Sequence, residues 1–418
     1  MHSKAMLPLL LAAMSFATPA PAQQIDARTQ ARIDRILRST PLIDGHSDLP
    51  GELRDAGFRV DGLESGGQAR PKPLMTDMAG LRAGRVGGQF WSVYISGTIT
   101  GDAAIRTTLE QIDISRRLID AYPSDLALAL SADDVVRIHK SGRVASMLGI
   151  EGGRQIGGSL AALRQFYNLG ARYMTLTHNQ TTEWADSATD EPRHGGLSPI
   201  GVQVVAEMNR LGMLVDLSHV SPEAMTDAIA ATRAPVIFSH SNAFALNPHP
   251  RNVPDDVLRS LTANGGVVMV NFYPVFLSPQ VAEWARRRIG EEARLKATFP
   301  FSAERVKAAL TSWETANPRT AVGVDVVADH LDHIARVAGP DHVGLGGDHD
   351  GIPYTVVGLE TVAGYPLIFA ELIRRGWSDT NLAKLAGGNV LRAMRQAERV
   401  AASMRGQPPS LITLDPAK

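Results

Sequence analysis

Short apolar runs alternate along this chain with longer stretches of helical patterning. Eight such runs are Pro41–Gly45, Gln89–Ile95, Val144–Ile150, Tyr173–Thr177, Met213–Leu217, Pro235–Phe238, Gly266–Phe272 and His342–Gly346. Several of them are apolar at nearly every position, which is typical of strands buried on both faces of a parallel sheet. The pattern therefore predicts a parallel sheet of eight strands.

The stretches between these runs carry helix signals. Ser198 and Pro199 precede Ile200–Leu211 as a plausible cap and first-turn pair, and Pro222–Ala231, Asp255–Ala263 and Val324–Val337 are similar helical stretches. Eight strand–helix alternations predict an α/β fold of the (β/α)8 TIM-barrel type. A doubly wound open sheet alternates in the same way, so the positions of the polar residues must discriminate between the two.

The first residues have the pattern of an export signal. His2 and Lys4 precede the apolar run Met6–Phe16, and Ala20–Ala22 ends it with an A-x-A cleavage pattern. A membrane-spanning helix needs roughly 20 apolar residues, and this run is much shorter. We expect cleavage after Ala22 and a periplasmic protein without a membrane anchor. The mature chain, 23–418, is expected to form one domain.

Charge and cysteine content exclude several classes of protein. The 42 basic residues nearly balance the 43 acidic ones, which argues against nucleic-acid binding and against a polybasic membrane surface. Cysteine is absent, so cysteine-ligated zinc, iron–sulfur clusters and thiol catalysis are excluded.

Histidine and carboxylate residues stand at the carboxyl ends of six of the predicted strands. They are His46 and Asp48, then Glu151, His178, His219 and His240, and finally Asp348 and Asp350. In a barrel these strand ends meet at one rim, where active sites of this fold are built. The placement therefore favours the barrel and predicts one shared site.

Five of these residues form a plausible ligand set for metal. His46 and Asp48 are one residue apart, so in a strand they point to the same side. Glu151 either bridges two metals or caps the next helix, and each of His219 and His240, taken singly, is more often a hydrogen-bonded core residue. Together they offer only nitrogen and oxygen ligands, which fits Zn²⁺, Mn²⁺ or Co²⁺. Five ligands exceed the usual three of one catalytic zinc and suit two cations that share the carboxylate and a hydroxide.

Three further residues acquire roles beside such a centre. Asp348 can transfer a proton to a leaving amine, although G-G-D-H-D-G is also a turn sequence. His178 can stabilise an oxyanion, or it is a hydrogen-bonded histidine at a strand end. Arg251 can pair with a substrate carboxylate, or it is a solvated surface arginine.

An ordered series of motifs makes the chain resemble a known family. The motifs include I-D-G-H-S-D-L-P, G-G-Q-F-W-S-V-Y, G-I-E-G-G, L-T-H-N, G-M-L-V-D-L-S-H, F-S-H-S, R-N-V-P-D-D-V-L, M-V-N-F-Y and V-G-L-G-G-D-H-D-G. Over nearly all of 41–400 the chain resembles the membrane (renal-type) dipeptidases of the amidohydrolase superfamily.

The resemblance implies a barrel with two zinc ions per subunit. His46, Asp48 and Glu151 match the ligands of one zinc, and Glu151, His219 and His240 match those of the other. His178 and Arg251 match substrate-binding residues, and Asp348 matches the residue that transfers a proton. The implied substrate is a dipeptide, including dipeptides with a D-residue at the C-terminal position. We expect a homodimer.

The chain departs from the family pattern at several positions. Ser47 stands where asparagine is usual, His349 replaces phenylalanine beside Asp348, and Phe276 stands where a substrate-contacting tyrosine is often found. The segment 277–323 is longer and more charged than its counterpart, and we expect an inserted helical lid or oligomer contact. Two alternatives stay open: an amidohydrolase that acts on N-acyl D-amino acids or β-lactams, and a non-catalytic periplasmic binding protein.

Overall fold

Eight parallel strands close into a barrel in this protein. The computed structural model describes residues 25–64 and 73–412, so the predicted signal peptide, 1–22, lies outside the described residues. The strands are β1 (Leu42–Ser47), β2 (Val86–Tyr94), β4 (Val144–Glu151), β5 (Ala171–Thr175), β6 (Leu214–Asp216), β7 (Ile237–Phe238), β8 (Val267–Val270) and β9 (Val343–Leu345). They pair in the order β2-β1-β9-β8-β7-β6-β5-β4, and the pairing of β2 with β4 closes the ring.

This closure confirms the predicted barrel and excludes the open sheet. Each of the eight apolar runs overlaps one strand of the ring. The pattern missed a ninth strand, β3 (Leu126–Leu128), which pairs with the first residues of β4. It is three residues long and only partly buried, so it carries little periodic signal.

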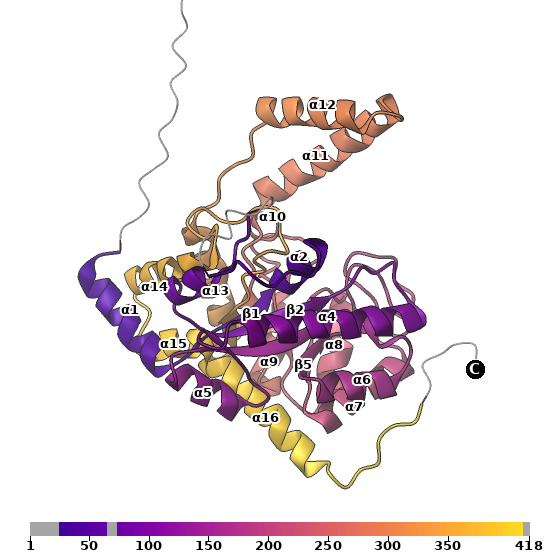
Figure 1. Ribbon diagram of the computed structural model, residues 1–418, viewed down its shortest axis with the longest axis vertical. Coiled ribbons are helices and arrows are strands. Elements are labelled where there is room, and N and C mark those ends of the chain that lie inside the picture. Colours follow the sequence, from indigo (N-terminus) through magenta and orange to yellow (C-terminus); the bar gives the residue numbers. More distant parts are fainter. Residues whose placement is uncertain (1–24, 65–72, 413–418) are drawn as a thin grey trace, which may run out of the picture.

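Helices surround the barrel (Figure 1). The longer ones are α1 (Ala27–Ser39), α4 (Gly101–Ala121), α5 (Ala132–Lys140), α6 (Leu160–Asn168), α7 (Pro199–Leu211), α8 (Pro222–Ala231), α9 (Asp255–Asn264), α13 (Val324–Val337), α14 (Tyr365–Arg374) and α16 (Asn389–Ser403). Short helices are α2 (Leu49–Asp55), α3 (Met78–Ala83), α10 (Pro274–Leu277) and α15 (Asp379–Ala383). The predicted cap is confirmed at α7, where Ser198 accepts a hydrogen bond from the Gly201 amide.

The barrel interior is filled by large side chains that leave no room for others. Phe90, Met147, Tyr173 and Met269 are fully buried members of one apolar cluster. A Cβ atom on Gly149 would collide with the Tyr173 ring, so glycine at that position lets the tyrosine extend across the interior. This packing fixes where Tyr173 places its hydroxyl group.

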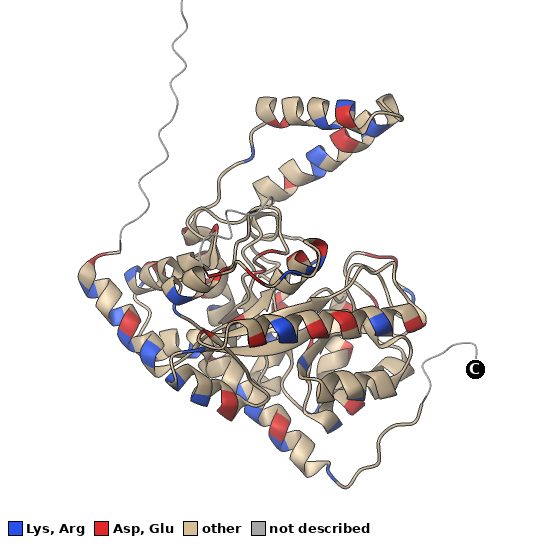
Figure 2. Ribbon diagram, in the orientation of Figure 1, with Lys and Arg blue, Asp and Glu red and all other residues tan. Residues whose placement is uncertain are grey.

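A helical hairpin projects from the barrel (Figure 1). It consists of α11 (Pro279–Thr298) and α12 (Ala303–Ala316), which lie within the segment expected to contain inserted helices, and we call it the arm. Figure 2 shows that charged residues of both signs are distributed along both helices. Among the residues that the structure describes, no helix is long and apolar enough to cross a membrane.

Candidate active site

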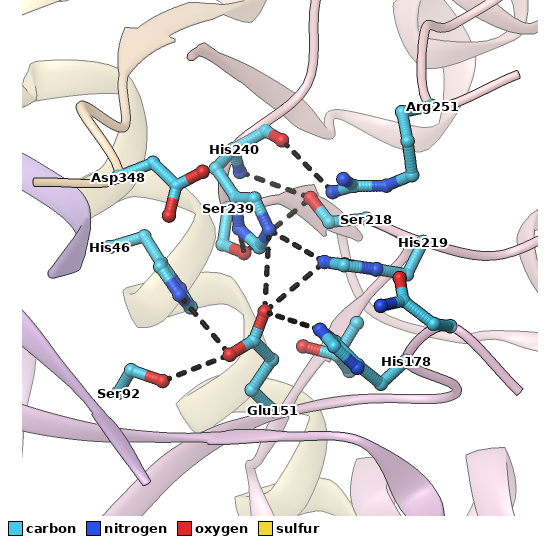
Figure 3. A network of polar contacts seen from close by, with 12 residues as sticks. His46, Ser92, Glu151, His178, Ser218, His219, Ser239, His240, Arg251 and Asp348 are labelled. Atoms are coloured by element: carbon cyan, nitrogen blue, oxygen red, sulfur yellow. Dashed lines mark hydrogen bonds and ion pairs between the residues drawn. The ribbon is translucent and has the colours of Figure 1, made fainter. Parts of the chain in front are cut away.

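The predicted site residues meet at the carboxyl-end rim of the barrel (Figure 3). Glu151 is the last residue of β4 and His46 lies within β1 near its carboxyl end, while the others follow the ends of β1, β5, β6, β7 and β9. Asp48 differs slightly from expectation, because β1 ends at Ser47 and Asp48 is the N-cap of α2. Its Oδ2 nevertheless lies 3.3 Å from His46 Nε2.

Glu151 stands at the centre of this group, and its two oxygen atoms face different partners. Oε2 lies 3.4 Å from His46 Nε2 and accepts a hydrogen bond from Ser92 Oγ at 3.1 Å. Oε1 lies 3.1 Å from His219 Nε2 and 3.6 Å from His240 Nε2. A carboxylate placed in this way can bridge two cations.

Overlapping groups of ligand atoms gather around Glu151. His46, Glu151 and His240 form one group, Glu151, His178 and His219 a second, and His46, Asp48 and Asp348 a third, each with its ligand atoms within 4.8 Å of one another. The groups include all five residues of the predicted ligand set. They also include His178 and Asp348, for which other roles were predicted.

The electrostatics of these residues fit a cation. Burial lowers the pKa of His219 and of His240 well below the usual value, so both imidazoles are neutral and can donate a lone pair. Burial opposes the ionised form of Glu151, but His46 and His178 outweigh it and hold the pKa of Glu151 well below its usual range.

The surroundings of His46 indicate that the carboxylates of Asp48 and Glu151 require a positive charge. Burial lowers its pKa, but Tyr173, Glu151 and Asp48 together raise the pKa well above the usual value. His46 Nε2 is buried and has no hydrogen-bond partner in the part of the chain described. Two carboxylates around this atom therefore demand a positive charge, and a divalent cation would satisfy them better than a proton does. The donor set fits a metal ion.

Asp348 is a buried carboxyl group beside this centre. Burial raises its pKa to about 7, and the charges of Asp48 and Glu151 act in the same direction. Its Oδ2 accepts a hydrogen bond from Asn271 Nδ2 at 2.8 Å. The sequence reasoning assigned no role to Asn271, although M-V-N-F-Y was among the recognised motifs. A carboxyl group with this pKa can hold or release a proton near neutral pH.

Arg251 is buried at the wall of the site, which contradicts the solvated-arginine alternative. Only 4% of its surface is exposed, and burial lowers its pKa to about 10. Nη2 donates to the His240 carbonyl at 3.4 Å, Nε has no partner among the described residues, and the guanidinium lies 5.0 Å from the centre of the Phe276 ring. A buried cation with free donors is suited to an anionic ligand.

These residues line a cavity of about 560 Å³. Asp48, Glu151, His178, Arg251 and Asp348 all reach its surface, together with Tyr94, Tyr273, Phe276 and Asp350. His178 approaches Glu151 Oε1 at 3.6 Å, and burial lowers its pKa. The cavity brings a cation-binding centre, a guanidinium and a proton-carrying carboxyl group into contact with one small ligand.

The family model of the membrane dipeptidases, peptidase family M19, matches residues 30–408. The chain belongs to the membrane dipeptidase family. The members of this family are metallo-dipeptidases. The family resemblance predicted from the sequence motifs is confirmed.

Solved structures resemble this dipeptidase-family chain over most of its length. A probable dipeptidase, PvdM, from Pseudomonas aeruginosa has 24% sequence identity and a TM-score of 0.75, with 90% of this chain and 99% of that chain covered. A metallo peptidase from Rhodobacter sphaeroides, liganded with a phosphinate mimic of the dipeptide L-Ala-D-Ala, has 24% identity and a TM-score of 0.70, with 86% and 99% covered. At this identity the likeness shows a common fold.

The departures from the family pattern lie at different distances from the chemistry. His349 turns away from the site: its Nε2 lies 3.1 Å from the Leu359 carbonyl, and its ring packs against Phe272 and Tyr365. Phe276 borders the cavity and contacts both His249 and Tyr273. Of these two changes, only Phe276 can contact a ligand directly.

Proposed function

We propose that this chain is a binuclear zinc dipeptidase that hydrolyses dipeptides, including those with a D-residue at the C-terminal position. The observation that carries the proposal is Glu151, whose two oxygen atoms face His46 on one side and His219 with His240 on the other. His46, Asp48 and Glu151 would hold one cation, and Glu151, His219 and His240 would hold the other. Mn²⁺ and Co²⁺ would suit the same nitrogen and oxygen ligands.

Two bound cations would supply a nucleophilic water at neutral pH and polarise the scissile carbonyl. The residues of the chain would then position the substrate and transfer the proton that its cleavage requires. Arg251 binds the C-terminal carboxylate, because its guanidinium is buried and keeps free donors toward the cavity. His178 contributes a hydrogen bond to the carbonyl oxygen as negative charge develops on it.

Asp348 carries the proton. As water adds to the carbonyl carbon and the C–N bond breaks, a proton must reach the leaving amine. Asp348 would accept a proton from the water and then donate it to the amine, because its carboxyl group lies beside the candidate metal ligands and reaches the surface of the cavity. Asn271 holds the carboxyl group in place through its hydrogen bond to Oδ2.

The likeness to a structure that holds a mimic of L-Ala-D-Ala supports a dipeptide as the class of substrate. The cavity of about 560 Å³ accommodates a molecule of that size. We further propose a homodimer located in the periplasm after cleavage at Ala22, on the strength of the N-terminal sequence and the resemblance.

Metal analysis and a substrate panel test this proposal. We expect two zinc ions per chain and turnover of L-L and L-D dipeptides. Zinc close to zero after purification in metal-containing buffer would overturn the proposal. Cleavage of N-acyl D-amino acids or β-lactams, without cleavage of dipeptides, would leave the metal centre standing and replace the substrate.

A further inference from the structure

Two of the candidate ligand histidines are supported at their second ring nitrogen by buried hydroxyl groups. His46 Nδ1 lies 2.9 Å from the Tyr173 hydroxyl, and His240 Nδ1 lies 2.8 Å from Ser239 Oγ. All four side chains are at most 1% exposed. Because water has no access to these contacts, the position of each proton follows from the other hydrogen bonds of the two hydroxyl groups.

The Ser239 hydroxyl has only one proton, and it donates this proton in a hydrogen bond to Asp216. Ser239 Oγ donates to Asp216 Oδ2 at 2.6 Å, whereas its other hydroxyl neighbour, Ser218 Oγ, is 3.5 Å away. Ser239 Oγ must therefore accept the proton of His240 Nδ1. That tautomer leaves the lone pair of His240 on Nε2, the atom that faces Glu151.

Asp216 is built as an acceptor. Its Oδ1 receives the backbone amides of Ser239 at 2.8 Å and Ser218 at 3.1 Å. Its Oδ2 receives the hydroxyl groups of Thr175 and Ser239, both at 2.6 Å. Burial raises the pKa of Asp216, but four donors around one carboxylate stabilise the ionised form. Asp216 itself belongs to none of the candidate metal-binding groups.

His46 is also supported at Nδ1 by a buried hydroxyl group, and the group behind that hydroxyl is a neutral carbonyl. The Tyr173 hydroxyl donates to the Gly45 carbonyl at 3.2 Å, so it accepts the proton of His46 Nδ1. The lone pair of His46 is then on Nε2, which faces Asp48 and Glu151. The third histidine, His219, has no hydrogen-bond partner for Nδ1 among the described residues.

We propose that Ser239 with Asp216 and, separately, Tyr173 are positioning residues that lock His240 and His46 in the tautomer able to bind metal through Nε2. The two cation positions thus have different supports: an ionised carboxylate behind His240 and a neutral carbonyl behind His46. A carboxylate relay makes its histidine the stronger donor. This inference rests on the proposed binuclear function.

Ser239→Ala on the full chain is the direct test. Zinc affinity is measured by competition with a chromogenic chelator, and the Co²⁺-loaded protein is compared by its absorption spectrum. We expect one of the two cations to bind about 10–100-fold more weakly, with an altered Co²⁺ spectrum. Ser239→Thr keeps the hydroxyl group and should restore the affinity, and Asp216→Asn should repeat the loss.

Ser241→Ala is the matched control. Ser241 is a fully buried serine in the same segment, and its hydroxyl lies 3.2 Å from Ser218 Oγ. The Ser241→Ala variant should bind both cations as the unaltered chain does. Without metal, the variants at Ser239 and Ser241 should have the same melting temperature. Unchanged affinity in both Ser239→Ala and Asp216→Asn, or an equal loss in Ser241→Ala, would overturn the inference while the dipeptidase proposal stands. An unaltered chain that binds no zinc would overturn both.

Discussion

The barrel rim and the arm are stabilised in different ways. At the rim, buried polar groups have partners far away in the sequence, as in the bond from Asn271 to Asp348, 77 residues apart. In the arm, only Leu295, Val306 and Leu310 form a buried cluster of their own. This difference indicates that the geometry of the site depends on closure of the whole sheet, whereas the stability of the arm depends on two adjacent helices.

The charges of the arm strengthen this contrast. Arg294 pairs with Glu291 three residues earlier, and Arg288 pairs with Glu314 across the hairpin at 2.6 Å. Solvent screens exposed pairs of this kind, so they add little to the stability that the small apolar cluster provides. We therefore expect the arm to unfold locally at a lower free-energy cost than the barrel.

The two regions meet at the base of the arm. A row of aromatic rings runs from Trp313 through Trp284, Tyr354 and Tyr273 to Phe276, with successive ring centres 6.2, 6.4, 5.3 and 5.1 Å apart. Tyr273 and Phe276 line the cavity. Changes at the tip of the arm should leave the site intact, whereas changes at its base can reach the cavity wall.

The largest effect is expected from Asp348→Asn at the rim. Turnover should fall by about 100-fold or more, because a positioned proton carrier contributes about 10²–10⁴-fold. The amide oxygen can still accept the hydrogen bond of Asn271, so both metals should remain bound. Steady-state kinetics and metal analysis on the same preparation check this. Full activity would remove Asp348 from proton transfer.

His219→Ala should lose one cation. The variant removes the nitrogen atom nearest to Glu151 Oε1, at 3.1 Å. Metal content by mass spectrometry should fall from two ions per chain to one. The control is His342→Ala, which removes a buried histidine that lies immediately before β9 and is hydrogen-bonded to the Gly266 carbonyl at 2.7 Å. Equal metal loss in both variants would point to general destabilisation.

Asp350→Asn should change how stability depends on pH. Burial raises the pKa of Asp350 to about 7, far above its ordinary value. A carboxyl group whose pKa is raised on folding contributes fully to the free energy of unfolding at low pH. That contribution is lost as the pH rises from about 4 through 7. Asparagine removes this loss of stability, so the metal-free variant should be the more stable protein at pH 8, by on the order of 4 kcal/mol.

Urea unfolding of the metal-free protein at pH 5 and pH 8 measures this effect. Asparagine can keep its Oδ1 as the acceptor for the Met75 amide, a bond of 2.7 Å in the parent chain. The difference in unfolding free energy between variant and parent should grow toward pH 8. The same difference at both pH values would show that Asp350 does not titrate in this range.

The smallest effect on the whole protein is expected from Leu310→Ala in the arm. The matched change in the barrel is Leu148→Ala, at a fully buried position of β4. The barrel variant should lose about 2–5 kcal/mol of unfolding free energy. The arm variant should keep the melting temperature, the metals and the activity, and lose hydrogen-exchange protection only within 279–316. A fall in activity in Leu310→Ala would show that the two regions are coupled.

Much of this molecule follows from local sequence. The apolar runs predicted all eight strands of the ring, because strands buried on both faces are apolar at nearly every position. Caps such as Ser198 and Ser221 lie within three residues of the amides that they bind, so they too can be read locally. The candidate ligands could be predicted because each lies at or just after the carboxyl end of a strand, and the barrel brings those ends together.

Other features needed the tertiary structure. Tyr173 meets His46 across 127 residues of sequence, and Asn271 meets Asp348 across 77. Neither residue type signals such a partner, because the contact exists only after the sheet has closed. His349 is adjacent to Asp348 in sequence yet points behind the site, which spacing along the chain could not show.

The sequence by itself determined the barrel and the residues at its rim, since periodicity and strand ends are local properties. Only the tertiary structure decided which hydroxyl group supports which histidine, and that Asp216 lies behind His240. It alone decided that the arm projects from the barrel. These features depend on how side chains of neighbouring strands and helices pack together, and no local pattern encodes their distances.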